Sequence, residues 1–362
     1  MNLNKIKVDV WLLIPILLLS MFGLMVLFSA SGGNYSIVKS QFFKIIIGLV
    51  SFILISQVKP EKIKTVFSKP FYILTLILLI FVFLFGTKIM GAQRWLNLYV
   101  ISIQPSELMK LALPMMLGYM IYKNGLPKKN IDIFKYSLIM LMPIFFVLVQ
   151  PDLGTSILIA LSGIYLIFQA GLSWYFITLS SALVFSIFPI FWLLIKDYQK
   201  QRILTMFNPE LDPLGHGYHT IQSKIAIGNG GFSGKGYFEG TQTQLDFIPE
   251  QHTDFIFSAL AEEFGTLGYI ALILLYSILI GRMIYIILNS ESIYEKLVGG
   301  SITMIFSSYI FVNIGMVMGI LPVVGVPLPF FSYGGTFLIT LIFSLGLLSS
   351  FSVNKNSKKY YF

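Results

Sequence analysis

The sequence predicts an all-α integral membrane protein, a bundle of about ten transmembrane helices with one long extracytoplasmic loop between spans 7 and 8. Of its 362 residues, 56% are hydrophobic and only 11% are charged, whereas a soluble domain carries about 25% charged residues. So little polar surface cannot cover a water-soluble globule. Cysteine is absent, which excludes a disulfide framework, a thiol nucleophile and a thiolate metal site.

Ten apolar segments qualify as spans, for which a helix needs about 20 residues. They lie at roughly 10–30, 40–57, 70–87, 106–122, 136–150, 154–169, 173–195, 254–290, 297–320 and 333–352. The eighth is too long for one span, so we expect it to begin as a loop or a re-entrant helix. The first lacks a small-residue cleavage site and is interpreted as a retained span. We therefore treat residues 1–362 as one polytopic membrane domain, with a large outer loop at about 196–253.

The basic residues indicate the orientation, because cytoplasmic loops carry an excess of Lys and Arg. If the N-terminus is cytoplasmic, 15 of the 25 Lys and Arg residues lie on the cytoplasmic side. They are Lys5, Lys7, Lys59, Lys62, Lys64, Lys69, Lys123, Lys128, Lys129, Lys135, Arg282, Lys296, Lys355, Lys358 and Lys359. Ten spans then place both termini in the cytoplasm and the 196–253 loop outside. The net charge of +9 reflects anionic headgroups rather than nucleic acid.

Three acids lie where the long outer loop meets the eighth apolar segment. Asp254 stands at the boundary, and Glu262 and Glu263 follow inside the apolar segment. Acids within a membrane are costly and therefore point to function. The alternative for Asp254 is an N-cap or first-turn acid that satisfies free backbone N–H groups, and this residue alone does not decide between the two roles.

Charged side chains also occur at the second outward loop and the fourth span. Arg94 stands beside Trp95 and either anchors the chain at the membrane interface or holds a phosphate through its planar fork. Glu107 and Lys110 are three residues apart and share one helix face. They either neutralise each other or form a polar patch facing an internal cavity, and we favour the cavity. Asp152, at an outer helix end after a proline, is a weak signal alone.

The long outer loop contributes Arg202 and Lys235. Lys235 lies in the glycine-rich run 228–236, which departs from a P-loop because Asn229 replaces the first glycine and Gly236 follows the lysine. A cation among free N–H groups suits a diphosphate, although a flexible linker has the same composition.

The three histidines form no metal-ligand pattern. His216 and His219 lie in a stretch that we expect to be a loop, where they would be solvated or hydrogen-bonded, and His252 stands near Asp254. We also find no serine–histidine–aspartate constellation.

Six stretches of the sequence resemble the SEDS (shape, elongation, division and sporulation) family of bacterial membrane glycosyltransferases. They are GAQRWL (91–96), QPSELMK (104–110), QPDLGTS (150–156), FNPELDPLG to GKG (207–236), FIPEQHTDFIF to LAEEFG (247–265) and NIGMVMGILPVVGVPLPFFSYGG (313–335). They occur in the family's order over nearly the whole chain. The wording of the last is similar to the elongation branch rather than the division branch.

The resemblance implies a peptidoglycan glycosyltransferase of the bacterial cytoplasmic (inner) membrane, active at its outer face during cell elongation. The implied substrate is lipid II, a disaccharide-pentapeptide on undecaprenyl diphosphate. The implied partner is a class B penicillin-binding protein, a transpeptidase that crosslinks the strands. Asp254 takes the family's proposed catalytic acid position.

The residues agree with that chemistry. Forming a β1,4 link from an α-diphosphate inverts the anomeric carbon, which requires a base at the acceptor hydroxyl and positive charge at the leaving diphosphate. Asp254 is the candidate base. The candidate cations are Arg94, Lys110, Arg202 and Lys235. Three further acids either position substrate or hold a divalent cation such as Mg²⁺ or Mn²⁺, and the sequence leaves this open; they are Glu107, Asp152 and Glu262.

A flippase or transporter for a lipid-linked precursor is the alternative from a different class. Ten spans with intramembrane charges fit it as well, but the charges here cluster at the outer side rather than at the midplane. A scaffold that only recruits the crosslinking enzyme would leave the buried acids unexplained.

Overall fold

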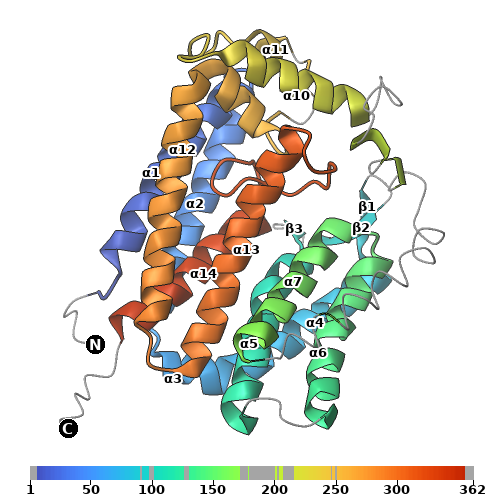
Figure 1. Ribbon diagram of the computed structural model, residues 1–362, viewed down its shortest axis with the longest axis vertical. Coiled ribbons are helices and arrows are strands. Elements are labelled where there is room, and N and C mark those ends of the chain that lie inside the picture. The colour runs from blue at the N-terminus through green and yellow to red at the C-terminus, as the bar shows by residue number, and fades with distance from the viewer. Residues whose placement is uncertain are drawn as a thin grey trace.

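The protein is a bundle of long helices, with a small sheet beside it and two further helices across one end (Figure 1). The computed structural model describes residues 6–89, 92–97, 102–125, 130–171, 178, 200–201, 204–206, 216–245, 247–248 and 251–354. The first half contains α1 (Val10–Ala30), α2 (Tyr35–Ser56), α3 (Pro60–Lys62), the π-helical turn η1 (Ile63–Phe67), α4 (Ser68–Phe85), β1 (Thr87–Ile89), β2 (Ala92–Asn97), β3 (Ser102–Ile103), α5 (Pro105–Asn124), α6 (Asn130–Val149) and α7 (Leu153–Gln169). The second half contains α10 (His216–Gly230), α11 (Thr241–Gln244), α12 (Ile256–Leu288), α13 (Ile293–Val317) and α14 (Thr336–Val353).

Six helical stretches in the described ranges are long and apolar enough to cross a membrane: α1, α2, the run from α3 to α4, α12, α13 and α14. α7 and most of α6 are shorter apolar helices. α5 is 20 residues long but carries Glu107, Lys110 and Lys123. The expected seventh span, 173–195, lies outside the described residues apart from Thr178, so the count of ten stays a prediction.

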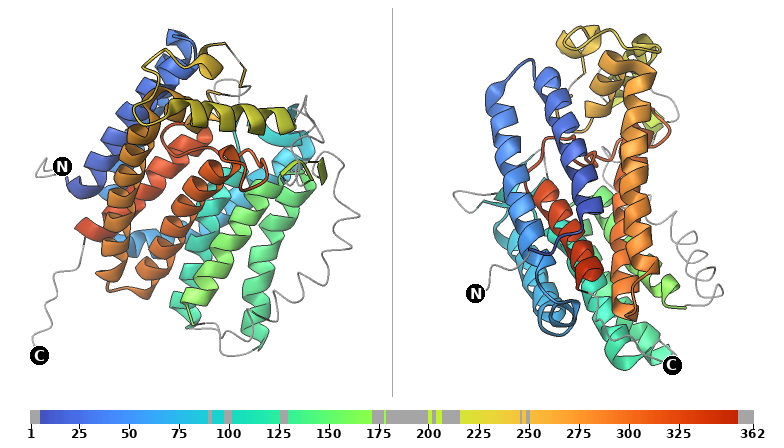
Figure 2. Two further views of the ribbon diagram at one scale, coloured as in Figure 1. Left: turned by 45° about the horizontal axis from the view of Figure 1, so that its top comes forward. Right: turned by 90° about the vertical axis from the view of Figure 1, so that its left-hand side faces the viewer.

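The helices pack as two groups that meet along α13 (Figures 1 and 2). One group contains α1, α2, α12 and α14, and the other contains α4 to α7. Their cores are aliphatic and aromatic. α14 lies against α2 so closely that a Cβ on Gly346 would stand 2.7 Å from the Cα of Phe52, which explains the glycine there.

The chain is mostly helical, as predicted, but it also contains a small sheet that the prediction did not include. β1, β2 and β3 form a small antiparallel sheet in the order β1-β2-β3, and β2 carries Arg94. These strands are only two to six residues long. A pattern that short has too few residues to show the alternation by which a strand is recognised.

The long outer loop is partly helical, which corrects the loop expected around His216 and His219. α10 runs from His216 to Gly230 and packs on α12. Its buried face is formed by small residues at helical spacing: Gly217, Thr220, Ser223, Ala226 and Gly230. Such residues allow close helix contact but have no strong hydropathy, so a search for apolar stripes misses the helix.

The eighth apolar segment is broken, as expected from its length. α12 includes Gly265, whose backbone angles are φ 60° and ψ −156°. Glycine adopts such a conformation without the steric penalty of other residues. Residues 256–264 therefore form a short helix of their own, and residues 266–288 form the apolar span.

Candidate active site

A cavity of about 560 Å³ lies between the two helix groups. Its walls come from β2, the first turns of α5 and α7, α10, the turn 251–255, α13 and the loop 318–335 that leads into α14. Predicted site residues from four distant stretches of the chain meet there. They are Arg94, Glu107, Lys110, Asp152 and Asp254.

Asp254 lies in the turn that immediately precedes α12, and its side chain is partly buried. The N-cap position of α12 belongs to Phe255, so Asp254 is not the capping residue of that helix. One carboxylate oxygen lies against the 318–335 loop, since a Cβ on Gly325 would stand 3.3 Å from Oδ2 of Asp254. Gly325 has φ +69°, so both its backbone conformation and its neighbour disfavour a side chain.

The backbone of the Asp254 turn is held by hydrogen bonds from α13 and from the loop between α13 and α14. Three successive carbonyls accept them: His252 O from Tyr333 N–H (2.9 Å), Thr253 O from Ser332 Oγ–H (2.6 Å) and Asp254 O from Asn313 Nδ2–H (2.9 Å). Asn313 is fully buried and also donates to Val326 O at 2.7 Å. The position of the carboxylate is thus determined by residues about 60 to 80 positions further along the chain.

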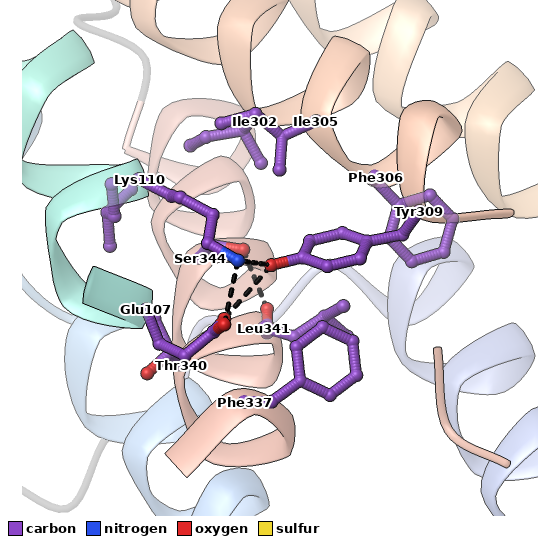
Figure 3. A pocket seen from close by; sticks show the side chains of 11 residues that line it. Glu107, Lys110, Ile302, Ile305, Phe306, Tyr309, Phe337, Thr340, Leu341 and Ser344 are labelled. Carbon is purple, nitrogen blue, oxygen red and sulfur yellow. Dashed lines mark hydrogen bonds and ion pairs between the residues drawn. The ribbon is translucent and has the colours of Figure 1, made fainter. Parts of the chain in front are cut away.

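Glu107, Lys110 and Tyr309 form a buried polar cluster. Figure 3 shows these side chains around a smaller pocket that they line, and all three also line the large cavity. Lys110 Nζ lies 2.7 Å from Glu107 Oε1, and the Tyr309 hydroxyl donates to Glu107 Oε2 at 2.9 Å. Lys110 also bonds to the Tyr309 hydroxyl. Glu107 and Lys110 therefore neutralise each other and also face a cavity, so both of the roles considered from the sequence apply. Mutual pairing makes burial of both charges tolerable.

Arg94 and Asp152 form a second charged pair. Arg94 Nε lies 3.5 Å from Asp152 Oδ2, and a terminal guanidinium nitrogen donates to Pro151 O at 2.6 Å. Asp152 is the N-cap of α7, where Oδ1 accepts the Thr155 N–H, and its Oδ2 accepts from the Gln104 amide. Its carboxylate both begins a helix and orients the arginine.

Lys235 and Glu262 are not brought to the cavity. Lys235 Nζ lies 3.6 Å from Glu262 Oε1 and 2.7 Å from Thr241 Oγ1. Glu262 is fully buried and accepts hydrogen bonds from Thr241, Gln242 and Thr243. The Lys235 N–H, from the glycine-rich run, donates to the Glu262 carbonyl. That run is thus bonded to α12 instead of offering its N–H groups to a diphosphate. Arg202 lies outside the described residues.

Residues that the sequence analysis did not select also line the cavity, among them Gln104, His219, Tyr309 and Tyr333. Gln104 and Tyr333 lie inside the quoted family motifs, so the motifs could have indicated them as site residues. Tyr309 lies in an apolar span where a tyrosine is unexceptional, and only its contacts with Glu107 and Lys110 reveal it.

The acids present do not fit a divalent cation. Within the described ranges, no group of three or more His, Asp or Glu side chains could hold a metal ion. Glu107 already pairs with Lys110, and Asp152 faces Arg94. Each of these two acids thus lies against a basic side chain.

Comparison with known proteins gives matches over almost the full length. A family described as cell cycle proteins, FtsW, RodA and SpoVE, matches residues 10–357. The chain is 44% identical over 355 residues to "Peptidoglycan glycosyltransferase MrdB" of Escherichia coli (strain K12), covering 97% of this chain and 95% of the relative. It is 33% identical over 367 residues to "Stage V sporulation protein E" of Bacillus subtilis (strain 168), covering 97% and 99%.

Two solved structures share the fold. One comes from work on the "structural coordination of polymerization and crosslinking by a peptidoglycan synthase complex", with a TM-score of 0.83, 30% identity and coverage of 96% of this chain and 98% of that chain. The other is the crystal structure of the rod shape determining protein RodA of Thermus thermophilus, with a TM-score of 0.73, 26% identity and coverage of 96% and 97%.

Proposed function

This chain belongs to the FtsW, RodA and SpoVE family of cell cycle proteins, and we propose that it polymerises lipid II into glycan strands with Asp254 as the general base. It is a peptidoglycan glycosyltransferase, as its relative at 44% identity is named, and its place is in cell-wall synthesis and cell shape. The observation that carries the assignment of the site is the meeting of Asp254 with Arg94 and Lys110 around one cavity between apolar helices.

In the proposed reaction, a hydroxyl oxygen of the acceptor sugar forms a bond to the anomeric carbon of the donor. The bond between that carbon and the diphosphate oxygen breaks, and the leaving polyprenyl diphosphate keeps the electron pair. The Asp254 carboxylate takes the proton of the attacking hydroxyl. A single displacement inverts the anomeric carbon, as a β1,4 link from an α-diphosphate requires.

Arg94 and Lys110 stabilise the negative charge that develops on the leaving diphosphate. Preorganised cations have this effect in a water-poor site because they need no rearrangement during the reaction. Asp152 and Glu107 keep these cations in place, as their contacts of 3.5 Å and 2.7 Å indicate. Their role in this proposal is to position the cations rather than to bind substrate directly.

We place the cavity at the outer face of the membrane, with both termini in the cytoplasm, on the distribution of basic residues. A class B penicillin-binding protein is the proposed partner. In support, the solved structure with a TM-score of 0.83 comes from a peptidoglycan synthase complex that couples polymerization with crosslinking. A flippase is not favoured, because the relatives are named as transferases.

Replacement of Asp254 by Asn tests the catalytic assignment. Asn keeps the shape of the side chain but cannot accept the proton, so Asp254→Asn should reduce polymerisation of lipid II by about 10²-fold or more. Lipid II binding and the folded state should persist. The measurement is polymer length from purified protein in detergent, where there are no membrane sides for a flippase to act between.

The matched control is Asp132→Asn, the same change on α6 at a residue that does not line the cavity, and it should polymerise normally. If Asp254→Asn also polymerises normally, the catalytic assignment fails. Absence of polymer from the wild type, even with its partner added, would remove the proposed function altogether.

A further inference from the structure

α2 presents a polar face to the loop that lines the cavity. Ser40, Gln41 and Lys44 lie on one side of this helix, as their spacing allows. Gln41 joins the helix to the loop, since its amide donates to Ser332 O at 3.1 Å and accepts the Gly334 N–H at 3.3 Å. The neighbouring residues Phe42, Phe43, Ile46 and Ile47 are exposed, which is the surface expected to face lipid.

Lys44 is a cation inside a membrane segment. It is half-buried within α2, a 22-residue candidate span, and its ammonium lies 3.8 Å from the centre of the Tyr333 ring. Cations over an aromatic face are attracted to it, but the ring carries no negative charge to neutralise the lysine. An ionisable residue at such a position is costly and points to function.

The arginine and the lysine that line the cavity are each opposed by an acid. Arg94 faces Asp152, and Lys110 faces Glu107. Among the ion pairs of the described residues none includes Lys44. Lys44 therefore supplies net positive charge next to the cavity, whereas the Arg94 and Lys110 pairs are close to neutral.

Tyr333 connects Lys44 to the cavity and to the Asp254 turn. Its side chain lines the cavity, its hydroxyl lies 3.2 Å from Ser40 Oγ, and its backbone N–H donates to His252 O. The Tyr333 hydroxyl thus lies beside a serine hydroxyl, and its ring lies against the Lys44 ammonium. Both hydroxyls can donate a hydrogen bond to an anion.

We propose that Lys44, Tyr333 and Ser40 form a second anion subsite, which binds the diphosphate of one of the two lipid-linked substrates on the α2 side of the cavity. The proposal rests on the proposed function, because transfer between two lipid-linked sugars brings two diphosphates to one cavity. One is held on the Arg94 and Lys110 side, and the other requires a cation elsewhere. The chemistry recognised is a phosphate group on a lipid.

The test is equilibrium binding of undecaprenyl diphosphate, a probe without sugar, to the full chain in nanodiscs of zwitterionic phosphatidylcholine. Lys44→Gln removes one charged contact and should weaken binding about tenfold. Lys44→Arg, which keeps the charge, should bind within a few-fold of the wild type. The matched control is Lys39→Gln, the same change at an exposed lysine of the same helix, and it should have no effect.

Tyr333→Phe keeps the ring and removes the hydroxyl, so it should weaken binding by a few-fold. Equal binding by the wild type and Lys44→Gln would overturn the proposal. A role of Lys44 in packing alone would lower the melting temperature of Lys44→Gln and leave binding of the diphosphate unchanged, which also overturns it.

Nanodiscs containing phosphatidylglycerol separate the two sources of lipid phosphate. If the site binds substrate, Lys44→Gln binds undecaprenyl diphosphate more weakly than the wild type in these nanodiscs as well. If the difference disappears there, bulk phospholipid headgroups occupy the site and the proposal fails. This test measures binding and not polymerisation. A wild type without polymerase activity would therefore refute the proposed function, but the effect of Lys44→Gln on diphosphate binding could still be measured.

Discussion

At the scale of single residues, the two cavity cations differ in how far a substrate can reach them. The Arg94 side chain is 30% exposed and lies 3.5 Å from its acid, whereas the Lys110 side chain is 5% exposed and lies 2.7 Å from Glu107. Arg94 also has a planar fork that matches phosphate geometry. We therefore expect Arg94 to contact the diphosphate directly and Lys110 to contribute less to its binding.

Arg94→Ala should weaken the use of lipid II without unfolding the protein. Loss of one charged hydrogen bond costs on the order of 2 kcal/mol, which is more than tenfold in rate. The measurement is the initial rate of polymerisation against lipid II concentration, with the melting temperature as a check on folding. Lys123→Ala, at the far end of α5, serves as the control for loss of a positive charge. A folded Arg94→Ala variant with normal rates would exclude this arginine from the site.

At the scale of elements, the short helix 256–264 follows the Asp254 turn and contacts the outer loop through Glu262. Glu262 on this helix is bound by Lys235, Thr241 and Thr243, and we call these four residues the loop clamp. Backbone bonds reinforce it on both sides of the Gly265 break, from Lys235 N–H to Glu262 O and from Thr266 N–H to Gly231 O. The clamp therefore holds the end of this short helix, just before Gly265, against the outer loop.

Disruption of the loop clamp should reveal whether Lys235 acts in packing or in binding. Lys235 is partly exposed, so Lys235→Ala should lower the unfolding free energy by no more than about 1 kcal/mol. Glu262→Ala leaves buried donors unsatisfied and should cost about 1–3 kcal/mol or more. Thermal unfolding measures both. The sequence analysis predicted that Lys235 contacts the substrate. That prediction requires Lys235→Ala to lose more than tenfold in lipid II use while its stability stays unchanged.

At the scale of the whole molecule, the start of α1 and the end of α14 lie on the same side of the bundle. Asp9 at the start of α1 bonds to Arg282 near the end of α12 (2.6 Å to a terminal nitrogen) and to Ser352 near the end of α14. α10 and α11 lie at the opposite end (Figure 1). Chain ends on one side require an even number of crossings, which the predicted ten spans satisfy.

Labelling of single cysteines should locate the two sides. The chain has no cysteine, so cysteines can be introduced at Asn229 on α10, at Asn289 between α12 and α13, and at Ser357, which lies outside the described residues. An impermeant reagent on intact spheroplasts should label position 229 only, and all three should react after lysis. Labelling at 289 and 357 but not at 229 would reverse the orientation and the placement of the cavity.

Within the described residues, most of the apolar helices and their approximate limits follow from local hydropathy. α1 coincides with the predicted segment 10–30, and α7 begins within one residue of the predicted 154. These features are local, because an apolar run that must satisfy its own backbone in lipid forms a helix wherever it lies. The quoted motifs likewise contain Arg94, Glu107, Lys110, Asp152 and Asp254, whose residue types alone indicate acid, base or cation chemistry.

Which of these charges meet depends on how distant segments of the chain pack. Arg94 reaches the cavity on a strand too short to predict, and Asn313 holds the Asp254 turn from 59 residues away. Lys235 and Glu262 resemble cavity residues in sequence, yet they bind each other because the loop folds back on α12 at Gly265. Such partners depend on how distant segments pack, and hydropathy and spacing along one segment carry no information about that packing.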